Sequence, residues 1–234
     1  MISIIIPVFN ESKTIEKLLV HLSENSSAEN ISEIIIIDGG SVDGTQKLVH
    51  NFSEKNISNT KLISSEKGRA RQMNAGAEMA TGKILYFLHA DSFPPVDFDA
   101  MIHSEVRKGN LAGCFRMKFD SDHLVLRFSQ WFTKFNFKFC RGGDQSLFIT
   151  QKAFQALDGY NESYTIYEDC EFINRVYDDY KFVVINEFLT TSSRKYQQNG
   201  TLKLQYHFTV IHLKKMLGAT PENLSAYYQK NIMS

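Results

Sequence analysis

The chain has little of what marks several common classes of protein. Its three cysteines, Cys114, Cys140 and Cys170, lie far apart and lack the spacing of metal ligands. An odd number of scattered cysteines argues against a disulfide framework and favours reduced thiols. The N-terminus lacks the basic start of a signal peptide, and no apolar run is long enough to cross a bilayer. We therefore expect a cytoplasmic protein.

Net charge and three familiar motifs are also absent. The 26 basic residues balance 26 acidic residues, and a formal net charge of +0 argues against a nucleic-acid partner. The sequence has no Gly-x-Gly-x-x-Gly after its first strands, no Gly-x-x-x-x-Gly-Lys-Ser/Thr and no Gly-x-Ser-x-Gly. These absences argue against a dinucleotide site, a P-loop and a nucleophile elbow.

What is present is an alternation of strand and helix patterns. Residues 34–45 read Ile-Ile-Ile-Ile-Asp-Gly-Gly-Ser-Val-Asp-Gly-Thr. Four isoleucines in a row are apolar on both faces, which is typical of a central strand in a parallel sheet. Similar runs at 3–7 and 84–88 are separated by helical stretches, which predicts an α/β fold with a mostly parallel sheet.

Polar side chains follow three of these strands. Asn10 and Glu11 follow the first strand, Asp38 ends the second, and His89 and Asp91 follow 84–88. Because parallel strands end at one edge of a sheet, where ligands bind in open α/β folds, these side chains should converge there. A single acid is better explained as a helix cap. All three strand ends together favour a site for hydrogen-bond donors, such as a base N–H or ribose hydroxyls.

The ordered motifs closely resemble the family 2 glycosyltransferases, which have the GT-A fold and use nucleotide sugars. The resemblance begins with Ser3-Ile-Ile-Ile-Pro-Val-Phe-Asn-Glu11 and the Asp38 segment. It continues through Gly68-Arg-Ala-Arg-Gln-Met-Asn-Ala-Gly76, Leu88-His-Ala-Asp91, Gly143-Asp-Gln145, Glu168-Asp-Cys-Glu171 and Thr191-Ser-Ser-Arg-Lys-Tyr196. The set looks like a small stand-alone bacterial subgroup of the family.

The resemblance implies a Rossmann-like GT-A domain over residues 1–200, with a nucleotide-binding half at 1–95 and an acceptor and catalytic half at 96–200. Residues 201–234 would be a helical extension packed on the same domain. The implied reaction is an inverting, metal-assisted transfer of a sugar from a nucleoside-diphosphate donor to an acceptor hydroxyl. UDP is favoured over GDP, and neither the acceptor nor the oligomeric state follows from the sequence.

Several nucleotide contacts come with the resemblance. Pro7, Asn10 and Glu11 would form the first nucleotide-binding loop, and Asp38 would bind the nucleobase. Arg71 matches a basic residue near the nucleotide, where a guanidinium suits a diphosphate. The alternative for Glu11 is a helix N-terminal acid. For Arg71 the alternative is a surface arginine, which Gly68 and Asn74 around it argue against.

Asp91 matches the last acid of the Asp-x-Asp metal motif, and His89 replaces the first. Mn²⁺ and Mg²⁺ take oxygen ligands that they share with phosphate. Imidazole suits Mn²⁺ better than Mg²⁺, so we expect His89 to contact the ribose or to pack beneath the site.

The catalytic pair by resemblance is Glu168-Asp169, with Asp169 as the base. Acids in the first turn of a helix also stabilise its dipole, which is the alternative explanation. Asp144 and Gln145 would line the donor or acceptor pocket, although a simple turn is an equal alternative. Arg194 would reach the diphosphate.

Aromatic and basic residues fill the stretch 123–139, which predicts one amphipathic helix, and two further helices are predicted at 202–216 and 221–232. Core packing is the default explanation for these segments. An acceptor groove, a lipid-linked acceptor or a peripheral contact at the inner membrane face would also explain them.

Two other functions remain open. A sugar-nucleotide nucleotidyltransferase has a related sheet, but the loop Val8-Phe-Asn-Glu-Ser-Lys13 lacks the glycine-rich, basic character that cradles a triphosphate. A catalytically silent nucleotide-sugar or glycan-binding protein would not need the acids Glu168, Asp169 and Asp91.

Overall fold

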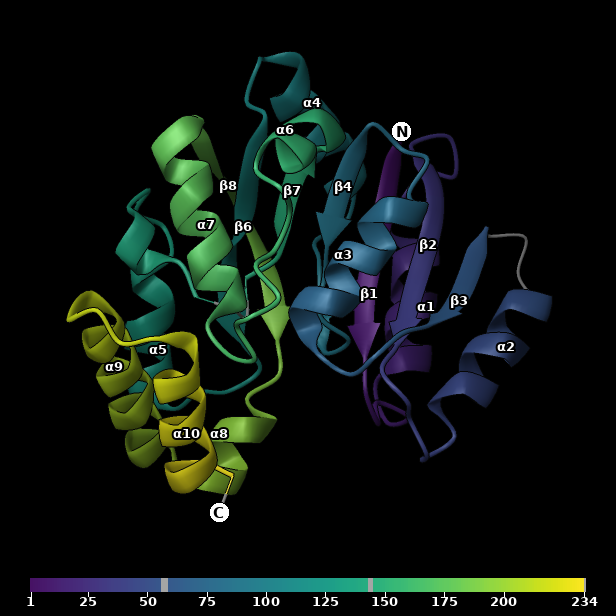
Figure 1. Cartoon of the computed structure of the whole chain (residues 1–234). Coiled ribbons are helices and arrows are strands. Elements are labelled where there is room, and N and C mark those ends of the chain that lie inside the picture. Colours follow the sequence, from purple (N-terminus) through teal and green to yellow (C-terminus); the bar gives the residue numbers. More distant parts are fainter. Residues whose placement is uncertain (56–58, 143–144, 234) are drawn as a thin grey trace.

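A mixed eight-stranded sheet forms the centre of the protein (Figure 1). The computed structural model describes residues 1–55, 59–142 and 145–233. The strands are β1 (Ile2–Val8), β2 (Ile31–Asp38), β3 (Thr60–Ser64), β4 (Ile84–Phe87), β5 (Ser92–Phe93), β6 (Ala112–Phe119), β7 (Leu147–Thr150) and β8 (Phe182–Thr191). They are ordered β3-β2-β1-β4-β7-β6-β8-β5 across the sheet. The first four strands in this order are parallel, and β7 runs antiparallel to both β4 and β6. The predicted mixed, mostly parallel sheet is confirmed.

Helices cover both faces of the sheet. They are α1 (Ile15–Glu24), α2 (Thr45–Lys55), α3 (Arg69–Met79), α4 (Phe98–Arg107), α5 (Leu124–Phe132), the 3₁₀ turn η1 (Lys138–Cys140), α6 (Gln151–Ala156), α7 (Glu168–Asp179), α8 (Arg194–Asn199), α9 (Thr201–Met216) and α10 (Pro221–Asn231). Buried side chains of α1, α2 and α4 share one core with the sheet. Those of α3, α6 and α7 share a second core on the opposite face. None of the described helices has both the length and the apolar composition of a membrane-spanning segment.

β2 is buried on both faces, as its isoleucine run predicts. Ile34 and Ile36 belong to the core beneath α1, whereas Ile35 and Ile37 belong to the core beneath α3. The helix α3 lies very close to the sheet, because a Cβ built on Gly76 would be 2.5 Å from Cγ2 of Ile5. This close packing fixes the position of α3 beside the carboxyl ends of β1 and β2.

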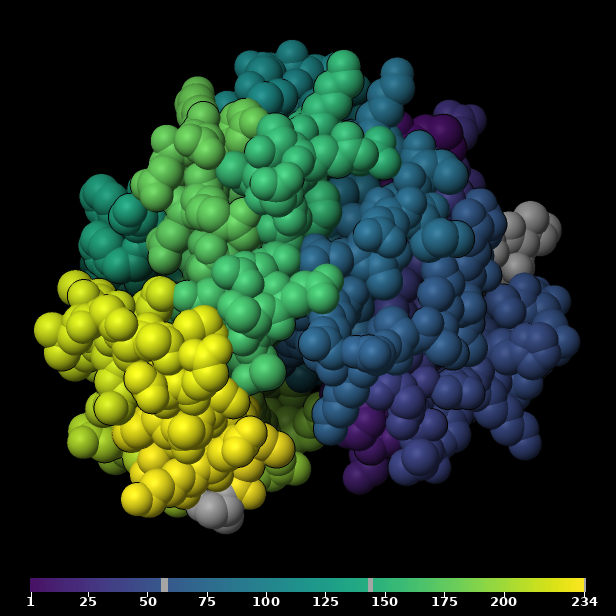
Figure 2. Space-filling view, viewed as in Figure 1, coloured from purple at the N-terminus to yellow at the C-terminus, as the bar shows by residue number. Residues whose placement is uncertain are grey.

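The C-terminal helices belong to a third core. Leu204 and Ile211 of α9 and Leu224 of α10 pack with Phe119 of β6 and Leu126 of α5. Figure 2 shows the C-terminal residues as a continuous block against the second half of the chain. The helices predicted at 202–216 and 221–232 are therefore confirmed as α9 and α10.

The single helix predicted over residues 123–139 is wrong, because α5 ends at Phe132 and η1 follows at Lys138. The cause lies outside the segment. The guanidinium of Arg141 donates hydrogen bonds to the carbonyl oxygens of Thr133, at 2.8 Å, and of Phe135. Since a continuing helix would need these carbonyls for its own hydrogen bonds, the buried arginine competes with helix formation.

Candidate active site

Two loops at the carboxyl ends of β1 and β2 are locked together. The backbone N–H of Asn10 donates to Oγ of Ser41 at 2.8 Å, and Oδ1 of Asn10 accepts from the N–H of Val42 at 2.9 Å. The N–H of Glu11 donates to Oγ1 of Thr45 at 2.9 Å. Asn10 has a φ of 57°, a left-handed conformation that asparagine tolerates better than most residues. These bonds hold Glu11 at the edge of the sheet.

Asp38 organises the second of these loops. Its carboxylate is fully buried and accepts hydrogen bonds from the N–H of Gly40 at 3.1 Å, the N–H of Ser41 at 3.0 Å and Nε2 of Gln46 at 2.6 Å. The predicted nucleobase contact therefore lies in a turn at the end of β2. Pro7, which pairs with Ile37 across the strands, lies beside it at the end of β1.

Sequence reasoning missed Gln72 of α3. Its side chain is 3% exposed, and its Nε2 donates to the carbonyl oxygens of Val8 at 2.9 Å and of Ile37 at 2.7 Å. It therefore ties the ends of β1 and β2 from below. Gly39 is the sequence feature that could have indicated this contact. A Cβ at that position would lie 3.2 Å from the Gln72 amide, so a glycine leaves room for it.

Arg194 joins the three strand ends. Its Nη2 lies 3.1 Å from each carboxylate oxygen of Glu11 and 4.0 Å from Oδ2 of Asp91. Arg194 opens α8, directly after β8, so one guanidinium connects the ends of β1, β4 and β8. The side chains of three motifs were expected to lie close together, and Glu11 and Asp91, from two of them, do so around Arg194.

Asp91 fits a role in holding a divalent cation. Its side chain is 28% exposed and offers carboxylate oxygens, which are the hard ligands that Mn²⁺ and Mg²⁺ take. Among the described residues, no group of three or more histidine, cysteine, aspartate or glutamate side chains is arranged to hold a metal ion. One carboxylate still suffices where substrate phosphates supply further oxygen ligands.

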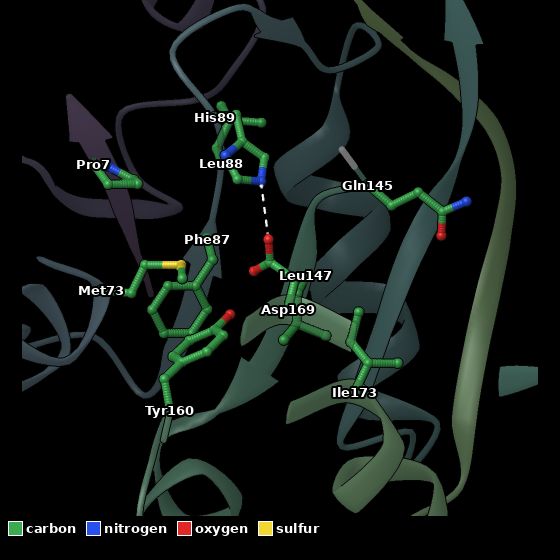
Figure 3. A pocket seen from close by; sticks show the side chains of 10 residues that line it. All are labelled: Pro7, Met73, Phe87, Leu88, His89, Gln145, Leu147, Tyr160, Asp169 and Ile173. Atoms are coloured by element: carbon green, nitrogen blue, oxygen red, sulfur yellow. Dashed lines mark ion pairs between the residues drawn. The ribbon is translucent and has the colours of Figure 1, made fainter. Parts of the chain in front are cut away.

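Glu168 and Asp169 open α7 beside the strand ends. Nη1 of Arg69 lies 3.3 Å from Oε1 of Glu168 and 3.8 Å from Oδ2 of Asp169. Nε2 of His89 lies 3.6 Å from the same oxygen of Asp169, and Figure 3 shows the two side chains facing each other. The imidazole is thus directed at the carboxylate pair.

Burial is the main influence on the pKa of Glu168. It raises the pKa of Glu168, the charge of Asp169 raises the same pKa further, and the Arg69 guanidinium offsets part of the rise. Neither Oε2 of Glu168 nor Oδ2 of Asp169 accepts a hydrogen bond from the described residues. A buried carboxylate oxygen without a hydrogen bond is suited to receive a proton from a bound hydroxyl group.

Other predicted site residues lie elsewhere or are already engaged. Arg71 pairs with Glu66 and, at 3.7 Å, with Glu162 on the surface, so Arg69 is the arginine of this motif that reaches the carboxylates. The amide of Gln145 is 3% exposed and accepts from Nη1 of Arg141 at 3.1 Å. Asp144 lies outside the described residues.

The mixed, mostly parallel sheet flanked by helices is that of a GT-A fold. Residues 3–158 match the model described as Glycosyl transferase family 2, and the chain belongs to that family.

Individual relatives agree with this assignment. Glycosyltransferase AglE of Haloferax volcanii is 35% identical over 94 residues, which are 40% of this chain and 31% of AglE. The chain thus spans about a third of the length of this curated relative.

Two solved structures share the fold. Residues 1–349 of Staphylococcus aureus TarS, in complex with UDP, have a TM-score of 0.69 at 17% identity, over 82% of this chain and 60% of that fragment. The mannosyltransferase PcManGT from Pyrobaculum calidifontis, in complex with GDP-Man and Mn²⁺, has a TM-score of 0.73 at 16% identity, over 99% of this chain and 68% of that one. At these identities the likeness concerns the fold.

Proposed function

We propose that the protein is an inverting glycosyltransferase, with Asp169 as its catalytic base. The observation that carries this proposal is the buried Asp169 oxygen beside His89 at the strand-end edge. Asp169 takes the proton of the acceptor hydroxyl as that oxygen bonds to the anomeric carbon of the donor sugar. The bond from that carbon to the phosphate oxygen breaks on the opposite face, and the nucleoside diphosphate leaves with the electron pair. Glu168 would keep Asp169 in place through Arg69.

The strand-end loops would hold the nucleotide. Glu11 would accept hydrogen bonds from ribose hydroxyls, and Asp38 would contact the base, next to Pro7 and Asn10. Arg194 lies near enough to both loops to exchange its contact with Glu11 for a diphosphate oxygen. Structural relatives in complex with UDP or GDP-Man support a nucleoside-diphosphate sugar, of which we favour the UDP form.

Three further nucleotide or donor contacts carry over from the family motifs. His89 would contact the ribose or hold Asp169 from beneath the site. Arg71 would need to leave Glu66 and Glu162 to reach a diphosphate. Gln145 would line the wall between the donor sugar and the acceptor.

Asp91 would hold Mn²⁺ or Mg²⁺ together with diphosphate oxygens. The ion supplies positive charge against the departing diphosphate. The Mn²⁺ in the PcManGT complex supports a divalent ion at this position. Arg194, at 4.0 Å from Asp91, would add charge at the same place.

We also propose a cytoplasmic protein that touches the inner membrane face through α5 and the segment that follows it, up to η1. Phe128, Trp131 and Phe139 are 66%, 47% and 78% exposed, and Arg127 and Lys134 lie among them. Exposed rings with basic neighbours suit the headgroup region of an anionic bilayer. Trp131 is the single tryptophan of the chain, so a blue shift of its fluorescence with phosphatidylglycerol vesicles tests the contact. An unchanged spectrum would contradict it.

We propose that the two halves of the domain have separate roles. Residues 1–95 would bind the nucleotide and residues 96–200 would bear the base and the acceptor site. Residues 201–234 would complete the same domain, since α9 and α10 share a core with β6 and α5.

Calorimetric titration with UDP, GDP and ADP, each with and without Mn²⁺, tests this function. We expect one diphosphate to bind tightly only with the metal. In a thermal shift assay, a ligand at about 100 times its dissociation constant should add roughly 2.7 kcal/mol of stability. If none of the diphosphates binds under either condition, the nucleotide site is wrong. Release of pyrophosphate from a nucleoside triphosphate and a sugar phosphate would instead identify a nucleotidyltransferase.

A further inference from the structure

A cavity of about 630 Å³ lies between the start of α7 and the C-terminal helices. Side chains of β6, α5, α8, α9 and α10 form its walls, and these helices lie together at one end of the molecule (Figure 1). Glu168, Asp169 and Arg69 line the same cavity. This volume is within the range of pockets that bind a small organic ligand.

Aromatic rings form much of the walls away from α7, and the polar side chains of Ser129, Gln205 and Thr209 lie among them. The rings that line the cavity include Phe119, Phe132, Phe139, Tyr167, Tyr196 and Phe208. Apart from Glu168 and Asp169, no acidic side chain among the described residues lines it. Ring faces favour a ligand with an apolar or aromatic body, and the hydroxyl and amide groups among them can serve its polar substituents.

Lys195 gives the cavity a cation. Its Nζ lies 5.0 Å from the ring centre of Tyr228 and 5.5 Å from that of Phe208, and it makes no ion pair within the described parts of the chain. The other two cations of the lining differ, because Arg69 faces Glu168 and Asp169 while Arg141 donates to backbone carbonyls. Lys195 is therefore the positive charge left for an acidic group on a ligand.

Asp169 connects this cavity to the strand-end edge. The carboxylate lines both the cavity and the small pocket of Figure 3, where Pro7 and His89 also lie. A molecule in the cavity can therefore present a hydroxyl group to the same carboxylate that faces the expected donor site.

We propose that the acceptor is a small alcohol or phenol with an apolar, ring-containing body and one acidic group, bound in this cavity. This inference rests on the proposed transfer to a hydroxyl group. The acceptor oxygen bonds to the anomeric carbon, its proton passes to Asp169, and the nucleoside diphosphate departs with the electrons of the broken bond. The ring body packs against the aromatic walls, and the acidic group lies near Lys195.

Two fluorescent probes test the cavity by direct binding. The probes are 7-hydroxycoumarin-3-carboxylate and 7-hydroxycoumarin, which differ only in the acidic group. We expect both to bind and the carboxylate form to bind about tenfold more tightly. Lys195→Gln should remove the difference between the two probes while leaving the affinity for the uncharged probe nearly unchanged.

A second pair of variants locates the probe. Thr209 of α9 lines the cavity and is exposed enough to tolerate a larger side chain, whereas Leu213 of the same helix lies outside it. Thr209→Trp should weaken both probes at least tenfold, and Leu213→Trp should not. Equal effects of the two variants, or no binding to the unaltered protein, would overturn the proposal.

Nucleotide binding separates this inference from the proposed function. Thr209→Trp should leave the affinity for UDP, measured with Mn²⁺, unchanged. Probe binding without any nucleotide binding would contradict the proposed function but not the ligand class of the cavity. Nucleotide binding without probe binding would contradict the ligand class alone.

Discussion

Nε2 of His89 lies 3.6 Å from Oδ2 of Asp169, which joins the end of β4 to the start of α7. The histidine lies where the family motif usually has an acid, and its ring faces the proposed base. An imidazole in this position restricts the orientation of the carboxylate.

His89→Asn should therefore slow the transfer more than it weakens nucleotide binding. We expect a loss of about 10- to 100-fold in turnover, since a small displacement of a catalytic group has effects of that size. Release of UDP from a UDP-sugar donor measures turnover, and calorimetry measures the affinity for UDP. A variant with weakened UDP binding and normal turnover would show that His89 contacts the nucleotide and not the base.

Arg194 and Arg71 are rival contacts for the diphosphate. Arg194 lies between Glu11 and Asp91, whereas Arg71 is held by Glu66 and Glu162 on the surface. Arg194→Gln should weaken UDP binding about tenfold or more, and Arg71→Gln should weaken it less. The two dissociation constants compared by calorimetry decide between them, and the reverse order would restore Arg71 as the main contact.

The dependence of nucleotide binding on a metal ion should itself depend on Asp91. Treatment with a chelator should lower nucleotide affinity, and added Mn²⁺ should restore it. Asp91→Asn keeps the shape but removes the charge, so we expect it to need at least tenfold more Mn²⁺ for half of the maximal UDP binding. An unchanged Mn²⁺ requirement would show that the ion binds without Asp91.

The ionised carboxylate of Glu33 should make the free energy of unfolding depend on pH. Burial alone would raise its pKa, but hydrogen bonds donated by Ser3, Thr81 and Lys61 outweigh burial and lower the pKa from about 4.5 to about 2. Because the unfolded chain binds the proton more readily, this stabilisation is complete above about pH 4.5 and is lost as the pH falls towards 2.

Glu33→Gln should lower the free energy of unfolding at pH 7 by roughly 2 kcal/mol. The difference from the unaltered protein should shrink between pH 4.5 and pH 2. Urea unfolding at several pH values across this range measures this difference in the free energy of unfolding. A difference that does not change with pH would mean that the ionised carboxylate is not the stabilising form.

The sheet and the convergence of its strand ends were predictable, because their causes are local. A strand of isoleucines is apolar on both faces, so it is stable only between two layers of helices. Ile34 to Ile37 lie in that position. Strand direction then brings Glu11 and Asp91 to one edge without any knowledge of their contacts.

The remaining features depend on partners distant in sequence. Arg194 reaches Glu11 across 183 positions, and no local pattern indicates which arginine makes that contact. Arg141 prevents α5 from continuing, because it binds the carbonyl groups of Thr133 and Phe135 just beyond the helix. Arg69 and Arg71 lie two positions apart in one motif, and only the packing of α3 decides which of them faces Asp169.

Replacement of the proposed base tests the central claim most directly. Asp169→Asn should reduce sugar transfer by about 100- to 10,000-fold while UDP still binds with nearly unchanged affinity. Asp178→Asn is the matched control on the same helix, because Asp178 is exposed and pairs only with Lys138 among the described residues. A variant at Asp169 that retains near-normal turnover would contradict the proposed mechanism, and a selective loss of turnover would support it.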